Sequence, residues 1–352
     1  MKFTNEIINT IKSFAIDNIE KHPNDIIGLL CNHFEITKPT AKKYMDELVT
    51  DKIVAPPKKG RYPAYHLLAQ EQNYSYKLKD NLEEDVLWRK DFMPLLTDIK
   101  DNVLRALQYS FTEMVNNVID HSSAKTLTIF FIKDAKKIQF YICDDGIGIF
   151  NKIQQDLGLD NPKQSILELA KGKFTSDAKR HSGEGIFFTS RICDGFAIFS
   201  GNLRFWGHKK EDIIFEDKKM RKGTSVFFEM DRSSDVSITD IFNEYSDPDA
   251  QPSFFRTRIP VKLMEYEGEA LLSRSQAKRL INRFDRFLEV FLDFDGVIEI
   301  GQAFADEIFR VFHNDHPDVH LIPVNCSSNV KRMIAHVSVE YCQDVYNKDI
   351  KL

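Results

Sequence analysis

The chain has 352 residues, of which 42% are apolar and 29% are charged, an ordinary composition for a folded protein that excludes collagen-like and wholly disordered chains. Its 48 Lys and Arg residues are outnumbered by 53 Asp and Glu residues, so the net charge of −5 excludes a uniformly basic nucleic-acid coat protein but not a locally basic domain. No apolar run reaches the roughly 18 residues of a membrane span, and the first residues lack the apolar core of a signal peptide. We therefore expect no membrane segment.

The chain carries five scattered cysteines, and none of them belongs to a CxxC pair. An odd, dispersed set predicts neither a disulfide framework nor a zinc ribbon. It favours a reducing compartment, so we expect the protein to be cytoplasmic.

Composition and periodicity divide the chain into four segments. Residues 1–78 are typical of helices followed by a short hairpin, and residues 79–232 alternate helical and strand patterns. Residues 233–260 are rich in Asp, Ser and Pro and lack a clear period, which predicts a linker. Residues 261–352 again mix strands and helices. We therefore expect a multidomain α/β protein.

The first segment predicts two helices joined by a tight turn. Residues 25–34 place apolar side chains on one face of a short helix. Thr37 can cap the next helix, and Pro39 falls in its first turn, where a missing N–H has little effect. Residues 53–54 and 62–68 can then pair as strands around a basic loop. The expected buried face of the second helix consists of Ala41, Tyr44, Met45 and Leu48.

This order of helix, turn, helix and basic hairpin resembles the winged helix-turn-helix. Residues 37–66 contain seven Lys or Arg and three Asp or Glu, a local charge of +4 in a net acidic chain. In such a module the second helix reads the major groove of double-stranded DNA and the wing contacts phosphates. A solvated basic surface and a protein-binding winged helix remain alternatives. The candidate DNA contacts are Lys38, Thr40, Lys42, Lys43, Lys58, Lys59 and Arg61.

The second segment contains no GxxxxGK[ST] motif, so a Walker-type nucleotide site is not supported. Instead, residues 111–122 (FTEMVNNVIDHS) have a helical period and carry Glu113 and Asn117 four residues apart, on one helix face. An Asn amide oxygen can bind Mg²⁺, and a Glu one turn earlier can orient a water molecule.

Three glycine-containing pieces follow in order. Residues 144–149 (DDGIGI) come directly after a predicted strand over 137–143, and residues 181–186 (HSGEGI) lead into a helix. Glycines before a helix N-terminus offer N–H groups and a positive dipole end to phosphates. The last piece, residues 222–228 (KGTSVFF), leads into a terminal strand. Taken alone, each piece is also compatible with an ordinary turn.

The ordered set of ExxxN, DxGxG, GxG and KGT resembles the GHKL superfamily of ATP-binding domains, which includes DNA gyrase B, the ninety-kilodalton heat-shock chaperone, histidine kinases and MutL. The resemblance covers about residues 85–232 and implies the Bergerat fold, an α/β sandwich with helices over one face of a mixed sheet. It implies ATP and Mg²⁺ as cofactors. By position, Asn117 would hold Mg²⁺, Glu113 would be the general base, Asp144 would bind adenine, Gly146 and Gly148 would shape the pocket, Gly183 and Gly185 would face the phosphates, and Thr224 would lie near adenine.

The same resemblance implies a lid over residues 150–182. The third motif reads GEGIFFTSR, unlike the GxGLGL common in histidine kinases, and residues 85–110 contain no His that could accept a phosphate. An orthodox autophosphorylating histidine kinase is therefore not expected. The Glu113–Asn117 pair fits an ATP-hydrolysing member and a serine kinase of the anti-sigma-factor type equally well. The candidate phosphate contacts in the lid are Lys171, Lys173, Thr175, Ser176, Lys179 and Arg180.

The last segment predicts a small α/β domain with strands over 287–294 and 319–324 and a helix over 303–312. Asp293-Phe294-Asp295-Gly296-Val297 resembles the first motif of haloacid-dehalogenase phosphatases. Only 55 residues follow Val297, however, and no acidic pair follows Lys331, so we set this interpretation aside.

The last segment resembles STAS and STAS-like domains more closely. In anti-sigma-factor antagonists a similar strand precedes a phosphoacceptor serine at a helix start, whereas here residues 301–303 read Gly-Gln-Ala and offer no hydroxyl. We expect a module that binds or couples to a protein partner.

Together these interpretations predict an ATP-binding and ATP-hydrolysing DNA-binding regulator in which the nucleotide switches the flanking domains. A homodimer is compatible with this hypothesis. The alternatives are a GHKL protein kinase or an anti-sigma-factor-like partner switch, with Ser273 and Ser275 as possible acceptors, and a scaffold in which the nucleotide is only structural.

Overall fold

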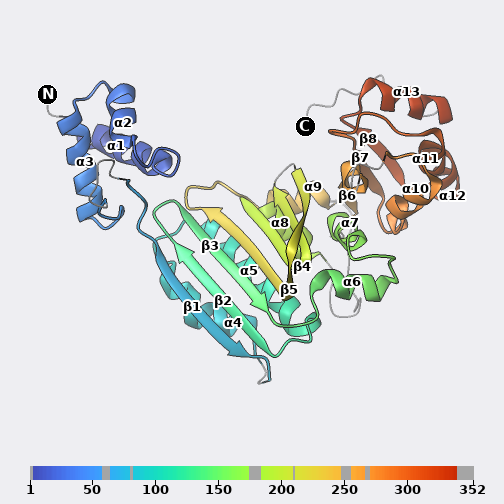
Figure 1. The fold of residues 1–352 in the computed structure, drawn as a ribbon, viewed down its shortest axis with the longest axis horizontal. Helices are drawn as coiled ribbons and strands as arrows, with labels where there is room; N and C mark the ends of the chain where they lie inside the picture. The colour runs from blue at the N-terminus through green and yellow to red at the C-terminus, as the bar shows by residue number, and fades with distance from the viewer. Residues whose placement is uncertain are drawn as a thin grey trace.

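The computed structural model divides into an N-terminal helical module, a central five-stranded sheet and a C-terminal three-stranded sheet (Figure 1). Within the ranges that it describes, no helix is both long and apolar enough to span a bilayer. The described residues are 3–57, 64–79, 82–173, 184–208, 211–246, 255–265 and 270–338.

The N-terminal module consists of α1 (Asn5–Asn18), α2 (Ile26–Phe34) and α3 (Lys38–Thr50), which pack around a separate apolar core. The predicted cap is present, because the side chain of Thr37 accepts a hydrogen bond from the Thr40 amide at 3.4 Å. The predicted buried face of α3 is confirmed at all four positions.

The expected hairpin after α3 is much reduced in the described residues. One antiparallel bridge joins Val54 to Leu67, and no strand of several residues forms on either side of it. Residues 58–63 lie outside the described ranges. The hairpin is therefore represented by a single bridge.

The central sheet has the strand order β1-β2-β3-β5-β4. Its strands are β1 (Gln70–Lys77), β2 (Thr126–Lys133), β3 (Lys137–Asp144), β4 (Gly195–His208) and β5 (Glu211–Asp231). Each neighbouring pair is antiparallel, so the expectation of a mixed sheet is wrong. Strand β1 falls within the segment assigned from sequence to the N-terminal domain, but it pairs with β2 along its whole length and belongs to this sheet.

Helices cover one face of the central sheet. Figure 1 shows α4 (Glu84–Leu87), α5 (Asp101–His121) and α8 (Gly185–Ile192) behind the strands. Strand β3 buries every second residue toward these helices, and Phe140 from β3 meets Phe111 from α5 with ring centroids 5.6 Å apart. Burial of each such aromatic side chain contributes about 1.5–3 kcal/mol, so this contact fixes α5 on the sheet.

The C-terminal part is a parallel sheet of β6 (Arg256–Pro260), β7 (Glu289–Asp293) and β8 (His320–Val324), in that order. Apolar residues of this part join those of the central domain in one continuous core. In the sequence, α6 (Ile149–Leu157) and α7 (Gln164–Lys171) lie between β3 and β4 of the central sheet and precede α8. The helices of the C-terminal part are α10 (Arg274–Ile281), α11 (Gln302–Asp306), which continues as a π-helical turn (Glu307–Phe312), α12 (His313–Asp315) and α13 (Ser328–Val337).

The segment 233–260, expected to be a linker, contains regular structure at two places. Helix α9 (Ile238–Tyr245) packs on α8, with the Phe242 and Phe188 rings 4.2 Å apart, and residues 256–260 form β6. Apolar residues at Ile238, Ile241, Phe242 and Tyr245 give α9 one buried face, which the surrounding Asp, Ser and Pro residues obscure in the sequence.

Candidate nucleotide site around helix α5

The C-terminal half of α5 carries the two residues expected to perform chemistry. The Nδ2 atom of Asn117 is buried and has no hydrogen-bond partner among the described residues. One turn earlier, Glu113 faces the start of α8, because a Cβ atom added to Gly185 would lie 2.0 Å from Glu113 Oε2. A side chain at position 185 would therefore displace Glu113. Helix α8 thus begins against the Glu113 side chain.

Asp144 ends β3, and its side chain is buried. Its Oδ1 atom accepts a hydrogen bond from the Gly146 amide at 2.8 Å, and the amide and hydroxyl of Thr224 also donate to this carboxylate. Burial raises the pKa of Asp144, and these hydrogen bonds only partly offset that effect. Among the described residues no cation pairs with Asp144, so its charge is compensated by neutral donors alone.

Glycines pack the turn after β3 against its neighbours. A Cβ atom at Gly146 would lie 2.0 Å from the carbonyl oxygen of Ser122, the residue that follows α5. At Gly148, where φ is +86°, it would lie 2.6 Å from Ser200 Oγ. The amide of Ile147 donates to the Ser122 carbonyl at 3.0 Å, which fastens this turn to the end of α5. Only glycine fits the close approach at position 146.

Gly223 is a site residue that the sequence analysis did not select. It has φ +70°, and a Cβ atom there would lie 2.0 Å from the carbonyl oxygen of Asp144. The next residue, Thr224, accepts a hydrogen bond from the Ile149 amide at 2.9 Å. The KGT motif was the available signal, because a glycine before a threonine at a strand start can mark a close backbone approach.

The described structure therefore brings six of the eight predicted nucleotide-site residues around α5 and the end of β3. Gly183 lies outside the described ranges, as do four of the lid residues, Thr175, Ser176, Lys179 and Arg180. The six are Glu113, Asn117, Asp144, Gly146, Gly185 and Thr224, and Gly148 adjoins them through its contact with Ser200.

Two expected phosphate contacts, Lys171 and Lys173, are engaged elsewhere. Lys171 is fully buried and donates to Glu168 at 2.6 Å and to the carbonyls of Arg279 and Asn282 at 3.1 and 2.9 Å. Burial lowers its pKa to about 8. The Lys173 ammonium donates to the carbonyl of Arg286 at 2.9 Å. The expectation for both residues is corrected: in this structure they attach the end of α7 to the C-terminal part.

The basic residues of α3 remain available at the surface. Lys38, Lys42 and Lys43 are exposed and Thr40 is half-buried, as expected for residues off the buried face. Lys43 lies 3.9 Å from Glu47, a weak surface pair that leaves its charge accessible. The predicted wing contacts Lys58, Lys59 and Arg61 lie outside the described ranges.

Asp293, which belongs to the phosphatase-like motif, is the last residue of β7 and forms an ion pair with Arg258. Its Oδ2 atom accepts hydrogen bonds from Arg258 Nε and Nη2 at 3.0 and 2.8 Å. Its Oδ1 atom accepts from Asn325 at 2.8 Å and from the Asp295 amide at 3.0 Å. A carboxylate with both oxygens engaged in this way serves structure, which agrees with setting the phosphatase interpretation aside.

Comparison with known families supports the C-terminal assignment. A family model described as a STAS-like domain of unknown function (DUF4325) matches residues 276–331, which run from α10 into the start of α13. A search of curated proteins found no match to the chain. The protein is therefore a multidomain α/β protein with a STAS-like domain in its C-terminal part.

Proposed function

We propose that this protein is an ATP-dependent regulator whose central domain binds Mg-ATP in the manner of the GHKL superfamily. The observation that carries the proposal is the convergence on α5. Three glycine-bearing segments approach Glu113, Asp144 and the Ser122 backbone at the end of α5 so closely that side chains at Gly146, Gly185 and Gly223 are excluded. Backbone approach of this kind is what a nucleotide cradle requires.

Each residue then has a defined task. The Asp144 carboxylate, which no described cation neutralises, accepts a hydrogen bond from the amino group of adenine, and Thr224 on the adjoining strand donates to the same carboxylate. Asn117 is the ligand for Mg²⁺, an ion that commonly takes one or two protein oxygens and completes its shell with phosphates and water. Among the described residues no group of three or more His, Cys, Asp and Glu side chains could hold a metal, which fits a magnesium ion held largely by the nucleotide.

Glu113, which lies against Gly185, would orient the attacking water as general base, and Gly183 and Gly185 before and at the start of α8 would receive the phosphates. Bound ATP would supply the phosphoryl group whose hydrolysis resets the switch. We further propose that α3 and the basic residues after it bind double-stranded DNA. The STAS-like domain would bind a protein partner, in a chain that can also form a homodimer.

A protein kinase or partner switch is the second candidate, and the STAS-like match beside the proposed ATP site favours it. The acceptor positions weaken this alternative. Helix α11 begins after Gly301 without a hydroxyl, and the Ser273 side chain caps α10 in a capping box with Gln276. A transferred phosphoryl group would therefore go to the exposed Ser275 or to another chain.

The test is incubation with γ-labelled ATP and Mg²⁺. The native chain should release free phosphate, and Glu113→Ala should lower that rate by about 100-fold or more while retaining ATP. Asn117→Ala should lose the dependence of binding on Mg²⁺. Gln108→Ala, an exposed position on the same helix, is the matched control and should behave as the native chain. Label retained on protein would favour the kinase, and absence of nucleotide binding would contradict the proposal.

DNA binding is tested by mobility shift at several salt concentrations. Lys42→Ala and Lys43→Ala should each weaken binding to all duplexes and reduce the slope of log affinity against log salt by about one. Lys21→Ala, an exposed lysine outside α3, is the control and should leave the slope unchanged. If all three variants had the same DNA affinity and salt slope, α3 would not belong to the DNA interface.

A further inference from the structure

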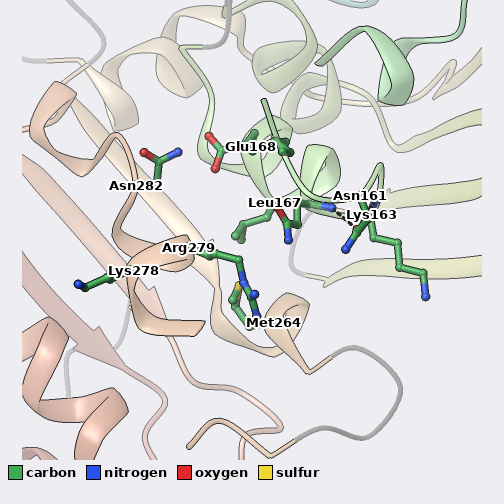
Figure 2. A pocket seen from close by; sticks show the side chains of 10 residues that line it. Asn161, Lys163, Leu167, Glu168, Met264, Lys278, Arg279 and Asn282 are labelled. Atoms are coloured by element: carbon green, nitrogen blue, oxygen red, sulfur yellow. Dashed lines mark hydrogen bonds between the residues drawn. The ribbon is translucent and has the colours of Figure 1, made fainter. Parts of the chain in front are cut away.

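A pocket of about 620 Å³ lies where α7 and the loop before it meet α10, outside the proposed ATP site. Its volume falls in the range of small-molecule sites, roughly 300–1,000 Å³. Leu159, Leu167 and Met264 give it an apolar lining, and Asn161, Gln164 and Asn282 add amide groups (Figure 2). Such a mixture of apolar wall and a few polar groups is typical of sites for small organic molecules.

The charges around this pocket are nearly all satisfied by protein partners. Glu168 at its back is held by Lys171 at 2.6 Å and by Arg283 at 2.8 Å. Lys163 pairs with Glu216 at 2.6 Å, and Lys278 lies 3.8 Å from Glu307. Both lysines extend away from the centre of the pocket in Figure 2.

Arg279 is the exception. Its side chain is half-buried and runs alongside Met264 (Figure 2), and within the described ranges its guanidinium makes no hydrogen bond or ion pair. Because Lys171 and Arg283 already pair with Glu168, no charge among the described residues of the pocket balances the positive charge of Arg279. A guanidinium in an apolar surrounding recognises a carboxylate or phosphate through paired N–H donors.

Arg279 also takes part in the contact between the central domain and the STAS-like domain. The backbone carbonyl of Arg279 accepts a hydrogen bond from the buried Lys171 of α7 at 3.1 Å, and Glu168 belongs to both the pocket and that buried cluster. A molecule held by the Arg279 side chain would therefore bridge α7 and α10. Because the Lys171 bond uses the backbone of Arg279, a side-chain substitution leaves it in place.

We propose that this pocket binds a small organic anion, a carboxylate or phosphate on an apolar body, with Arg279 as its anion-binding residue and Leu159, Leu167 and Met264 as its apolar contacts. Binding there stabilises the contact between the central domain and the STAS-like domain, because the ligand touches both. The pocket is thus an effector site separate from the proposed ATP site.

The test uses the fluorescent anion anilinonaphthalene sulfonate as a probe of the full-length chain. The native protein should show saturable binding, and Arg279→Met should weaken it by about tenfold or more, since a charge-assisted hydrogen bond is lost. Arg279→Lys keeps the charge without the paired donors and should give an intermediate affinity. Arg332→Met, at an exposed arginine of α13, makes the same chemical change away from the pocket and should leave affinity unchanged.

Displacement then defines the chemistry of the ligand. Benzoate or phenyl phosphate should compete with the probe, and the better competitor identifies the favoured head group, whereas neutral benzyl alcohol should not compete. Equal probe affinity in Arg279→Met and the native protein, or displacement by neither anion, would overturn the proposal. Asp144→Asn should retain probe binding, so failure of the proposed ATP site and failure of this pocket are distinguishable.

Discussion

Two buried aspartates end strands in this molecule, Asp144 in the central sheet and Asp293 in the STAS-like domain, and each precedes a glycine-containing turn. Asp293 is held by the guanidinium of Arg258 and by Asn325. Asp144 receives donors only from Gly146 and Thr224 in the described structure. Two similar sequence motifs thus produce different carboxylates: Asp293 forms an ion pair, whereas Asp144 can accept hydrogen bonds from a ligand.

The difference lies in partners that are distant in sequence. Arg258 precedes Asp293 by 35 residues and reaches it because β6 and β7 are parallel neighbours. Asp144 lies beside Thr224 because β3 and β5 pair, and no basic residue occupies the corresponding place. Whether a DxG-type motif is structural or functional is therefore decided by the neighbouring strand.

The largest expected effect separates Gly223 of β5, which packs on the backbone of Asp144, from Gly296 in the turn after Asp293. Gly223→Ala should destabilise the protein by more than about 3 kcal/mol, because its Cβ atom would lie 2.0 Å from backbone at φ +70°. Gly296→Ala, at φ +73°, meets only the flexible end of Lys262 at 3.0 Å and should lose about 1–2 kcal/mol. Urea unfolding of both variants measures the two free energies of unfolding. Equal losses of stability would show that the close approach of Gly223 to Asp144 has no added effect.

A smaller effect on stability separates the two carboxylates. Asp293→Asn should lower the free energy of unfolding by about 2 kcal/mol, since it leaves the partly exposed Arg258 without its counter-charge. Asp144→Asn should change stability by less than about 1 kcal/mol, because no described cation loses a partner. Thermal unfolding of the two variants at neutral pH checks this order. A greater loss for Asp144→Asn would indicate that its role is structural.

The smallest expected effect is on pH dependence. Burial raises the pKa of Asp144 above the ordinary value of an aspartate, and binding of adenine needs the ionised form. Nucleotide affinity should therefore fall on acidification at a higher pH than an ordinary aspartate would give. The pKa of neighbouring Asp145 is lowered by hydrogen bonds from the Thr126 and Lys125 amides, and its negative charge adds a small part of the rise at Asp144, so Asp145→Asn should move the profile only slightly, to lower pH. Affinity measured across mildly acidic pH checks both statements.

Local signals in the sequence predicted local structure well. The Thr37 cap and the buried face of α3 depend on residues within one or two helical turns, and the alternation over 137–143 indicated β3. The facing pair Glu113 and Asn117 also follows from helical spacing. These features need no knowledge of distant partners.

Features that depend on distant partners were missed. Strand β1 is polar, with Tyr74 and Tyr76 as its main apolar contacts, and only pairing with β2 some 50 residues later defines it. Lys171 was expected to contact phosphate, but its acceptors at Arg279 and Asn282 lie more than 100 residues away. Local periodicity carries no information on such contacts.

The most direct measurement of the central claim is calorimetric titration of Mg-ATP into the native chain, Asp144→Asn and Asp293→Asn. The account predicts that the native protein and Asp293→Asn bind with affinities within about twofold of each other, whereas Asp144→Asn binds about tenfold more weakly or worse. Asp144→Asn binding as tightly as the native chain, or a native chain that binds no nucleotide, would contradict the assignment of Asp144 and α5 to an ATP site.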